Sequence, residues 1–382
     1  MACFRRSRLV RGRLHRVVLA GIVSLTMVGC SSSRPSPYSG DTGVDEVPPE
    51  ITDGRGRFRE IFCAVLDHRA ATLPEHRDCE DALTRAGTEP DGTGRPVDLG
   101  RSDRGLVAAI VPGVGWDCIL RWLDPEETSV EHVRQFGFDA VVLDVDSLSS
   151  CSANSRQIRD AIMASPARHI EPHLVLIGYS KGAPDILEAL VTYPEIRQKL
   201  AAVVSVAGAV RGSPVADDVT QSKLELLRHW PGAQCSTGDS GAMESLRPAI
   251  RKAWLADNPL PRDVPFYSLV TCPEPDRISA VLKPSYKKLG RIDPRNDGMV
   301  LFDDQIIPGS TFLACLNADH WAVSVPIART HPHIGSTLVD ENDYPREALL
   351  EALLRLIEED LTHPPAQMQD SRSKMQDPPP TR

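Results

Sequence analysis

The pentapeptide Gly178-Tyr179-Ser180-Lys181-Gly182 holds the side chain best placed in this sequence to act as a nucleophile. It directly follows the apolar run 174–177 and directly precedes a helix-like stretch, 183–191. Between a strand and a helix, two glycines permit a turn so tight that the serine is strained and its hydroxyl is exposed. The pattern alone is common by chance, and such a serine could merely cap a helix. The context favours a nucleophile at Ser180.

A nucleophilic serine needs a general base and a carboxylate that orients the base. His320 comes shortly after the apolar run 311–316, so it can lie over the end of a sheet and reach Ser180. Asp297 lies in the turn Asn296-Asp297-Gly298, and the chain order serine, aspartate, histidine is that of one class of serine hydrolase. The base has competitors in His331, His333 and His363, and the acid in Asp276, Asp293, Asp303 and Asp304.

Acyl transfer also needs N–H donors that stabilise the oxyanion of the tetrahedral intermediate. We expect them from the main chain of Lys181 and of Val114. Val114 lies in the loop Pro112-Gly113-Val114-Gly115-Trp116, whose two glycines would let the main chain approach a substrate closely. We assign the Lys181 side chain no catalytic role and expect it to be solvated.

Apolar runs separated by helical stretches must position these residues. The runs cover 106–111, 140–145, 174–177, 200–206, 265–270 and 311–316. Nearly continuous apolar runs suit parallel strands that are covered on both faces, and helical connections imply right-handed crossovers. The sequence therefore predicts an α/β fold with a mostly parallel, doubly wound sheet, followed by an amphipathic helix over 344–361.

The remaining segments predict the domain organisation. We expect a signal peptide at 1–29, a Ser/Pro-rich tether at 30–50, a helical extension at 51–95 with two helices separated near Pro74, the main domain at 96–362, and a disordered tail at 363–382. The segment 211–262 is too long for a plain crossover. It predicts either a cap over the site or a surface excursion with one extra helix.

The N-terminal segment has the features of a bacterial export signal. Six arginines precede the apolar stretch 17–28, which is too short for a stable membrane span. Met27-Val28-Gly29-Cys30 is similar to a lipobox, so we expect lipidation of Cys30 and anchoring in the cell envelope, facing the periplasm or on an outer membrane. The alternative is an ordinary signal peptide in which Cys30 is incidental.

The net charge of the chain restricts the classes of partner that it can bind. The whole chain has a net charge of −9, and removing the six arginines of the signal gives −9 − 6 = −15. A surface this acidic repels phosphate backbones, so we expect no nucleic-acid binding. Any membrane association would come from acyl chains at Cys30.

Export also leads us to expect disulfides, because it places a protein in an oxidising compartment. Beyond Cys3 and Cys30 seven cysteines remain, and an odd number leaves at least one thiol free. Proximity along the chain makes three pairs plausible without fixing the connectivity: Cys63 with Cys79, Cys118 with Cys151, and Cys235 with Cys272, while Cys315 is predicted to be a buried strand residue. No Cys-x-x-Cys pair occurs, and we predict no metal site and no cofactor.

The chain resembles α/β-hydrolases, and among them bacterial secreted triacylglycerol lipases and related esterases. The resemblance covers roughly residues 104–360 and depends on four segments in order: the Pro112-Gly113 loop, Gly178 to Gly182, Arg211-Gly212-Ser213-Pro214-Val215-Ala216-Asp217, and Asn296-Asp297-Gly298 with Asp319-His320. It implies an α/β-hydrolase fold and a triad of Ser180, Asp297 and His320.

Some positions depart from those lipases. Pro112 stands where their oxyanion loop has a histidine, and Ala209-Val210 stands where they have Pro-His. Ala322 occupies the place of an aspartate that binds calcium in them, so the resemblance implies no calcium site here. The fold and triad carry over, whereas triglyceride specificity does not.

These observations lead to one main hypothesis and two alternatives. The main hypothesis is an exported, lipid-anchored serine esterase or lipase-like hydrolase that acts on small-molecule or lipid acyl esters. The first alternative is a thioesterase, amidase or polyester depolymerase with the same triad, because leaving-group choice depends on the pocket. The second is an envelope lipoprotein that uses the fold for binding without catalysis.

Overall fold

The computed structural model describes residues 36–38, 50–119, 129–164, 173–219, 236 and 238–363. Contacts divide the chain into two units, Met1–Arg34 and Pro35–Arg382, and every described residue belongs to the second. The predicted signal peptide, Cys30, most of the tether and the tail beyond residue 363 lie outside the described residues. No helix in the described part of the chain is long and apolar enough to span a membrane.

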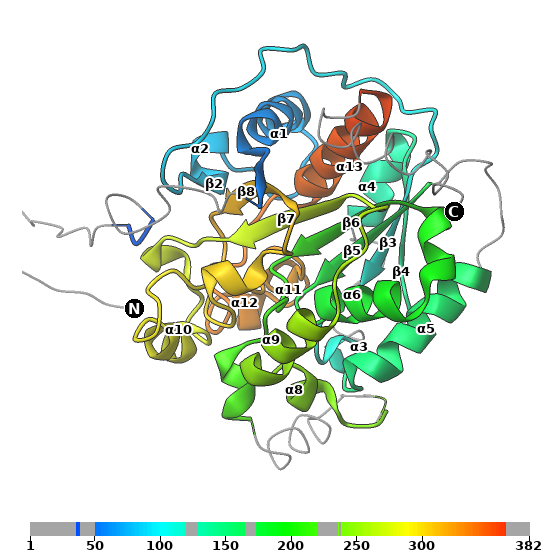
Figure 1. The fold of residues 1–382 in the computed structure, drawn as a ribbon. Coiled ribbons are helices and arrows are strands. Elements are labelled where there is room, and N and C mark those ends of the chain that lie inside the picture. Colours follow the sequence, from blue (N-terminus) through cyan, green and yellow to red (C-terminus); the bar gives the residue numbers. More distant parts are fainter. Residues whose placement is uncertain are drawn as a thin grey trace, which may run out of the picture. The chain divides into compact units, whose positions relative to one another are not determined.

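An eight-stranded sheet runs through this unit (Figure 1). Its order is β1-β8-β7-β6-β5-β3-β4, and β2 also pairs with β8. The strands are β1 Thr52–Asp53, β2 Leu83–Thr84, β3 Val107–Val111, β4 Asp139–Val142, β5 Leu174–Tyr179, β6 Leu200–Val206, β7 Phe266–Thr271 and β8 Thr311–Leu316. All pairs are parallel except β2 with β8. The predicted α/β fold with a mostly parallel sheet is therefore confirmed.

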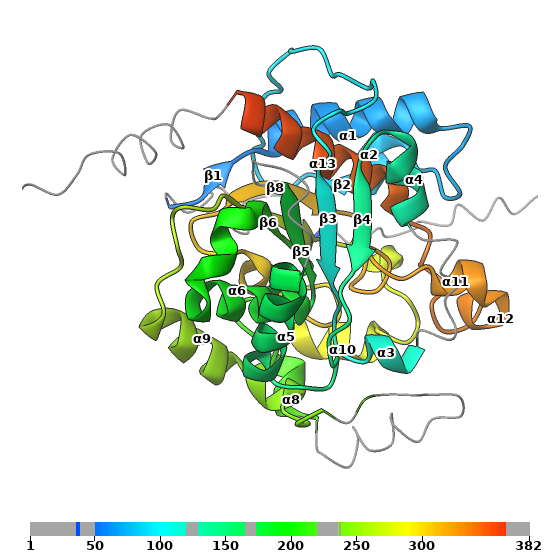
Figure 2. The same cartoon turned by 90° about the vertical axis from the view of Figure 1, so that its right-hand side faces the viewer.

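Helices cover both faces of the sheet, as the two views at right angles show (Figures 1 and 2). On one face lie α1 Arg55–Arg69, α4 Ser129–Gln135 and α13 Arg346–Thr362, and on the other α5 Cys151–Ala164, α6 Gly182–Thr192 and α9 Pro248–Asp257. The shorter helices are α2 Cys79–Ala82, α3 Trp116–Ile119, α8 Ala242–Ser245, α10 Lys283–Leu289, α11 Ile327–Thr330 and α12 Pro332–Gly335, and the 3₁₀ turns are η3 Pro194–Lys199, η4 Pro214–Asp217, η5 Pro275–Arg277 and η6 Phe302–Gln305.

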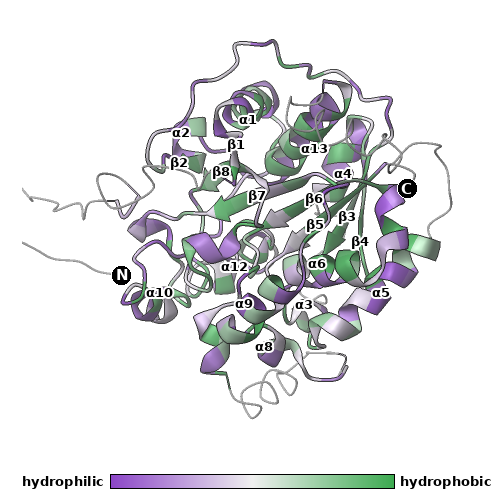
Figure 3. Cartoon of the chain, in the orientation of Figure 1, coloured by the Kyte–Doolittle hydropathy of each residue, from purple (hydrophilic) through white to green (hydrophobic). Residues whose placement is uncertain are grey.

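The alternation of side chains along each strand divides the core between these two layers. In β5, Val175 and Ile177 belong to the apolar cluster that includes α1 and α13, whereas Leu174 and Leu176 belong to the cluster that includes α5 and α6. Because both faces are covered, the strand is apolar throughout, as the hydropathy colouring of the central strands shows (Figure 3). This is why the six long strands could be recognised as continuous apolar runs.

The segment predicted as a helical extension also contributes to the sheet. Thr52 of β1 pairs with Thr311, and Leu83 of β2 pairs with Leu316, so both short strands extend β8. Helix α1 packs against α13. Tyr38, within the predicted tether, is buried in an apolar cluster with Phe302. Strands of two residues are too short to leave a periodic signal in a sequence.

The disulfides confirm one predicted pair and correct two. Cys63 is bonded to Cys79 as predicted. Cys272 is bonded to Cys315, so the predicted pair of Cys235 with Cys272 is wrong, and Cys235 itself lies outside the described residues. Cys272 directly follows β7 and Cys315 lies in the adjacent β8, which brings their Cα atoms within 5.2 Å. Cys118 is disulfide-bonded, but Cys151 is a buried free thiol, so the pair Cys118 with Cys151 is also wrong.

Candidate active site

The chain reverses the direction of its crossovers between β3 and β5. It leaves β3 for β4 on one side and returns to β5 on the other side of β3. The loops after β3 and β5 therefore diverge at a crevice beyond the carboxyl ends of the strands, which is where open α/β sheets bind ligands. The predicted oxyanion loop follows β3, and Ser180 follows β5.

Ser180 has the strained backbone predicted for a nucleophile elbow. Its φ of 52° is in the left-handed region, which costs a residue other than glycine about 1–3 kcal/mol. Neighbouring main chain holds it there: the Ser180 N–H donates to Val206 O at 3.1 Å, and its carbonyl accepts from Ala209 N at 3.0 Å and from Ala183 N at 3.2 Å. The end of β6 and the start of α6 thus fix the turn between them.

Glycines let the main chain close tightly around Ser180. A Cβ at Gly178 would lie 2.5 Å from Ala183 Cα, and one at Gly182 would lie 2.0 Å from the carbonyl oxygen of Val111. A Cβ at Gly113 would lie only 2.9 Å from Ser180 Cβ. The loop after β3 is therefore packed directly against the serine, as an oxyanion loop must be.

The three predicted triad residues lie within hydrogen-bonding distance of one another. His320 Nε2 is 2.9 Å from Ser180 Oγ, and His320 Nδ1 is 2.7 Å from Asp297 Oδ2. His320 is 3% exposed and Asp297 is fully buried. This arrangement suits a serine whose proton passes to a histidine that a buried carboxylate orients.

Asp297 is held by further donors around its carboxylate. Oδ1 accepts hydrogen bonds from the main-chain N–H groups of Met299 at 2.8 Å and Val300 at 2.7 Å. Oδ2 lies 2.6 Å from the hydroxyl of Thr271, at the end of β7, in addition to His320. The main chain adds one more link, because His320 N–H donates to Asp297 O at 3.1 Å.

The turn that carries His320 is shaped by its neighbour Asp319. Its Oδ1 accepts from the N–H groups of Trp321 and Ala322, both at 3.0 Å, and its Oδ2 accepts from Ser279 N–H at 2.8 Å. Burial raises the pKa of the Asp319 carboxyl above its ordinary value. The Tyr179 hydroxyl donates to His320 O at 2.5 Å, which anchors the turn to the elbow.

Of the two predicted oxyanion donors, Lys181 directly follows the serine, and Val114 directly follows Gly113, which packs against it. In the described part of the chain, the Lys181 N–H has no hydrogen-bond partner and so is free to face a ligand. The Lys181 side chain, in contrast, is not solvated as predicted: it is fully buried, with Nζ 2.7 Å from both carboxylate oxygens of Asp185. Asp185 also accepts from Asn154 Nδ2 at 2.8 Å, so the pair ties the elbow to α5.

Apolar side chains from the oxyanion loop, α8 and the loop of Asp297 share one apolar cluster. Val114, Met243 of α8 and Met299 are partly buried and pack against the same apolar cluster. Met299 is held in place because Ser213 Oγ donates to its carbonyl at 2.5 Å. Of the predicted cap at 211–262, the described residues include η4, α8 and α9, and α8 packs beside the oxyanion loop through Met243.

Several residues that the sequence offered as alternatives to Asp297 and His320 have other contacts. Asp293 and Asp303 both pair with Arg295, and Asp304 pairs with Lys252. His331 directly precedes α12 and His333 lies in it, and Figure 2 shows α12 apart from α6, the helix that follows the elbow. No group of three or more metal-ligating residues occurs in the described ranges.

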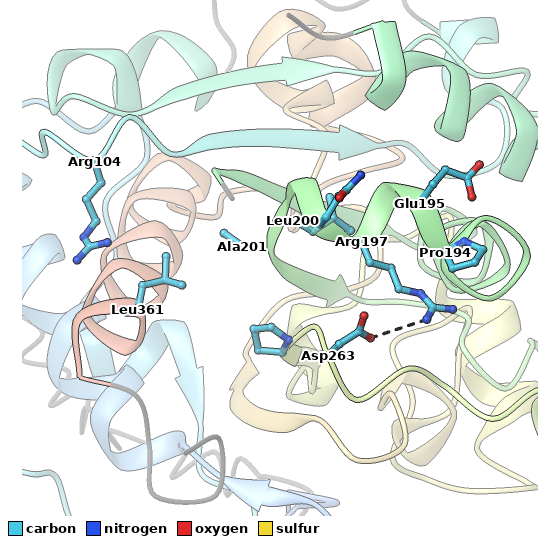
Figure 4. A pocket seen from close by; sticks show the side chains of 10 residues that line it. Arg104, Pro194, Glu195, Arg197, Leu200, Ala201, Asp263 and Leu361 are labelled. Atoms are coloured by element: carbon cyan, nitrogen blue, oxygen red, sulfur yellow. Dashed lines mark ion pairs between the residues drawn. The ribbon is translucent and has the colours of Figure 1, made fainter. Parts of the chain in front are cut away.

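Several cavities lie outside the triad, and two of them border the sheet. One of about 780 Å³ lies at the amino ends of β6 and β7, the sheet edge opposite to the one where Ser180 follows β5. Figure 4 shows the side chains around it. It is lined by Arg104, Pro194, Glu195, Arg197, Gln198, Leu200, Ala201, Asp263, Pro265 and Leu361. A mainly apolar cavity of about 100 Å³ lies between the sheet and α13 and includes Tyr179 and Val323. Of these two, only the smaller adjoins residues that neighbour the triad in sequence.

Sequence reasoning missed several residues of this site. Thr271, Asp185 and Gln305 are fully buried polar residues. Thr271 contacts Asp297, Asp185 contacts Lys181 of the elbow, and Gln305 contacts Thr271. The available signal for Thr271 was its place, because it follows the predicted strand 265–270 at the sheet edge where Ser180 lies. No local pattern marks the other two.

Comparison with known proteins supports the fold. The metagenomic carboxyl esterase MGS0156 has a solved structure that matches with a TM-score of 0.77 and 37% identity, over 85% of this chain and 97% of that one. The mature lipase BlEst2 of Bacillus licheniformis matches with a TM-score of 0.48 and 20% identity, over 64% of this chain and 95% of that one. No family model and no curated protein matches the chain. The resemblance predicted from the motifs is confirmed, and the chain belongs to the family of this carboxyl esterase, within the α/β-hydrolases that include lipases and esterases.

Proposed function

We propose that this protein hydrolyses carboxylic esters through an acyl-serine intermediate, with Ser180 as the nucleophile. The observation that carries the proposal is the continuous chain of contacts from Ser180 Oγ through the His320 ring to Asp297, at 2.9 and 2.7 Å. The carboxyl esterase at 37% identity supports esters as the substrate class.

The contacts suggest how the reaction proceeds. His320 Nε2 accepts the Ser180 proton as Oγ attacks the acyl carbonyl, and the imidazolium that forms is stabilised by Asp297 at Nδ1. The same Nε2 then protonates the leaving alkoxide, which departs and leaves the acyl-serine. Water, deprotonated by His320, hydrolyses the acyl-serine and regenerates the enzyme.

The oxyanion would be stabilised by the main-chain N–H groups of Lys181 and Val114. Such donors are effective because they are held in position before the charge develops. Gly113 allows this approach, since any side chain there would collide with Ser180. These donors belong to the main chain, so side-chain substitutions do not remove them.

The test is hydrolysis of a series of p-nitrophenyl esters, from acetate to palmitate, by the full-length protein purified in detergent. Wild type should turn over at least one ester, and Ser180→Ala should lower kcat by more than about 10⁴-fold. Hydrolysis of only short acyl chains would indicate an esterase, and a preference for long chains would indicate a lipase.

Thioester and amide substrates in the same assay address the alternatives. Faster turnover of a thioester or an amide than of any ester would replace the ester proposal, while the triad would stay. A non-catalytic binding module would be favoured by a serine beyond hydrogen-bonding reach of the histidine, which is not the arrangement found. The absence of turnover on all of these substrates would contradict catalysis.

We also propose that the protein is lipid-anchored at Cys30 in a bacterial cell envelope. The support is the sequence Met27-Val28-Gly29-Cys30 after an apolar stretch, which lies outside the described residues. Labelling of bacteria with radioactive palmitate should mark the wild type and not Cys30→Ala, and the variant should lose its membrane association. An unlabelled wild type would contradict the anchor without affecting the proposed catalysis.

A further inference from the structure

The carboxylate of Asp297 contacts a second side chain besides His320. Thr271 is the last residue of β7 and is fully buried. Its Oγ1 lies 2.6 Å from Asp297 Oδ2, the oxygen that is also 2.7 Å from His320 Nδ1. One carboxylate oxygen therefore has both a hydroxyl and the imidazole as donors.

The Gln305 amide holds the main chain of Thr271 through two hydrogen bonds. Its Oε1 accepts the Thr271 main-chain N–H at 2.8 Å, and its Nε2 donates to the Thr271 carbonyl at 3.3 Å. Because an N–H must face an oxygen and a carbonyl must face a donor, these two bonds exclude the flipped amide. Gln305 in turn is anchored through its own carbonyl, which accepts from Ser205 Oγ at 3.1 Å.

The hydroxyl of Thr271 then has a choice between two acceptors. Asp297 Oδ2 is at 2.6 Å and Gln305 Oε1 is at 3.0 Å, and a hydroxyl has only one hydrogen to donate. The carboxylate is both nearer and charged, and hydrogen bonds to charged oxygens are shorter and stronger than those to neutral ones. The hydrogen therefore lies on the Asp297 side.

The two oxygens of Asp297 are consequently fixed from different elements. The N–H groups of Met299 and Val300 hold Oδ1, and they belong to the same loop as Asp297. Among the described residues, Thr271 alone connects Oδ2 to the sheet, because His320 is itself on a loop after β8. Tyr179 of β5 holds the main chain of His320, but without Thr271 no strand residue in the described ranges would hold the carboxylate of Asp297.

We propose that Thr271 is a positioning residue for catalysis, supported by Gln305. Its hydroxyl holds Asp297 Oδ2 where that oxygen receives the Nδ1–H of neutral His320. This selects the tautomer whose Nε2 is free to accept the Ser180 proton. The inference rests on the proposed hydrolytic function and adds to it a residue that acts through Asp297.

The test compares Thr271→Val, which replaces the hydroxyl by a methyl group of similar size, with Thr271→Ser, which keeps the hydroxyl. Kinetics use the best p-nitrophenyl ester, with active enzyme counted by fluorophosphonate titration. Thr271→Val should lower kcat about tenfold or more with KM within about twofold, and Thr271→Ser should keep most of the activity. Should Thr271→Val fail to fold, Thr271→Ala against Thr271→Ser makes the same comparison.

Ser268→Ala is the matched control, since Ser268 is another fully buried hydroxyl in β7. It contacts Ser310 Oγ at 2.8 Å and Ile307 N–H at 3.0 Å and lies outside the triad. Its loss should lower the melting temperature and leave kcat within about twofold of wild type. A melting temperature lowered equally in both variants, with kcat lowered only in Thr271→Val, is the expected pattern.

The inference would be overturned by full kcat in Thr271→Val, or by a loss in Thr271→Ser as large as in Thr271→Val. An equal loss of kcat in Ser268→Ala would do the same, because it would show that any buried hydroxyl of β7 matters. Failure of the proposed function is recognised separately, since then the wild type itself neither hydrolyses an ester nor reacts with the fluorophosphonate.

Discussion

His320 and His132 each contact a fully buried carboxylate, and the surroundings of the two pairs differ. His320 Nδ1 is 2.7 Å from Asp297 Oδ2, and His132 Nε2 is 2.8 Å from Glu351 Oε2. Glu351 lies between the guanidinium groups of Arg69 and Arg355, at 3.1 and 2.7 Å. Asp297 instead has the Thr271 hydroxyl and main-chain N–H groups, and no lysine or arginine in the described ranges pairs with it.

The groups around each carboxylate distinguish the structural pair, His132 with Glu351, from the pair proposed for catalysis, His320 with Asp297. Burial raises the pKa of Glu351, but hydrogen bonds from His132, Arg69 and Arg355 outweigh it and bring the value to about 2. Its charge is neutralised by arginines of α1 and α13, and together with its contact to His132 of α4 it links the three helices. The donors that contact the Asp297 carboxylate are uncharged, so its negative charge remains available to stabilise an imidazolium at His320. A histidine–carboxylate contact alone therefore does not identify a catalytic site.

The largest effect should come from removing the charge of Asp297. Asp297→Asn should lower kcat by about 10⁴-fold, because an amide cannot hold His320 in the required tautomer or stabilise its cation. Steady-state kinetics on the best ester measure this, with circular dichroism melting as a check on folding. Asp276→Asn, at an exposed position outside the site, is the control and should keep wild-type activity. Retention of kcat by Asp297→Asn would remove the distinction between the two pairs.

Removing the charge of Glu351 should lower stability and leave catalysis nearly unchanged, the opposite of the effect at Asp297. Glu351→Gln should lower the free energy of unfolding by about 3 kcal/mol, because Arg69 and Arg355 lose their buried counter-charge. Its kcat per active enzyme should stay within about twofold of wild type at a temperature where it is folded. Urea denaturation and active-site titration measure the two quantities. A selective loss of kcat would show that this pair also serves the chemistry.

The two pairs should also be distinguished by pH. The pKa of Glu351 falls from 4.5 to about 2 on folding, so its contribution to stability is complete above about pH 4.5 and is lost as the pH falls toward 2. The difference in unfolding free energy between wild type and Glu351→Gln should therefore shrink over this interval. Urea unfolding at several values between pH 2 and 7 measures it. A difference that stays constant would contradict the ion-pair explanation.

The smallest effect should come from the histidine of the structural pair. His132→Ala removes one hydrogen bond to Glu351 while both arginines stay, so the free energy of unfolding should fall by about 1.5 kcal/mol. Its kcat should not change, whereas His320→Ala should abolish turnover. Parallel denaturation and kinetics of the two variants give the comparison. Similar losses of activity would contradict it.

How well the sequence predicts a feature of the fold or the site depends on how far apart in the sequence the contacting residues lie. The long strands and the elbow at Ser180 were predictable, because their patterns lie within a few consecutive residues. The pairing of Cys272 with Cys315 requires knowing that β7 and β8 are neighbours. The burial of Lys181 depends on Asp185 one turn later and on α5 packing over both, although nothing in the residue types excludes a solvated lysine.

The contacts that hold Asp297 and Glu351 in place join residues that are far apart in the sequence. Thr271 meets Asp297 only because β7 ends beside the loop after α10, and Gln305 meets Thr271 from η6. The Glu351 cluster joins three helices that are far apart in the sequence. Such contacts between buried polar residues depend on the order of the strands, so neither composition nor periodicity reveals them.

The central claim is that Ser180 is activated by His320, and covalent labelling tests it most directly. The full-length protein would be treated with a fluorophosphonate and digested, and mass spectrometry would locate the modified residue. We predict modification at Ser180 in the wild type, with a rate at least about 10³-fold lower in His320→Ala. Modification of a different serine, or an equal rate in His320→Ala, would contradict the account.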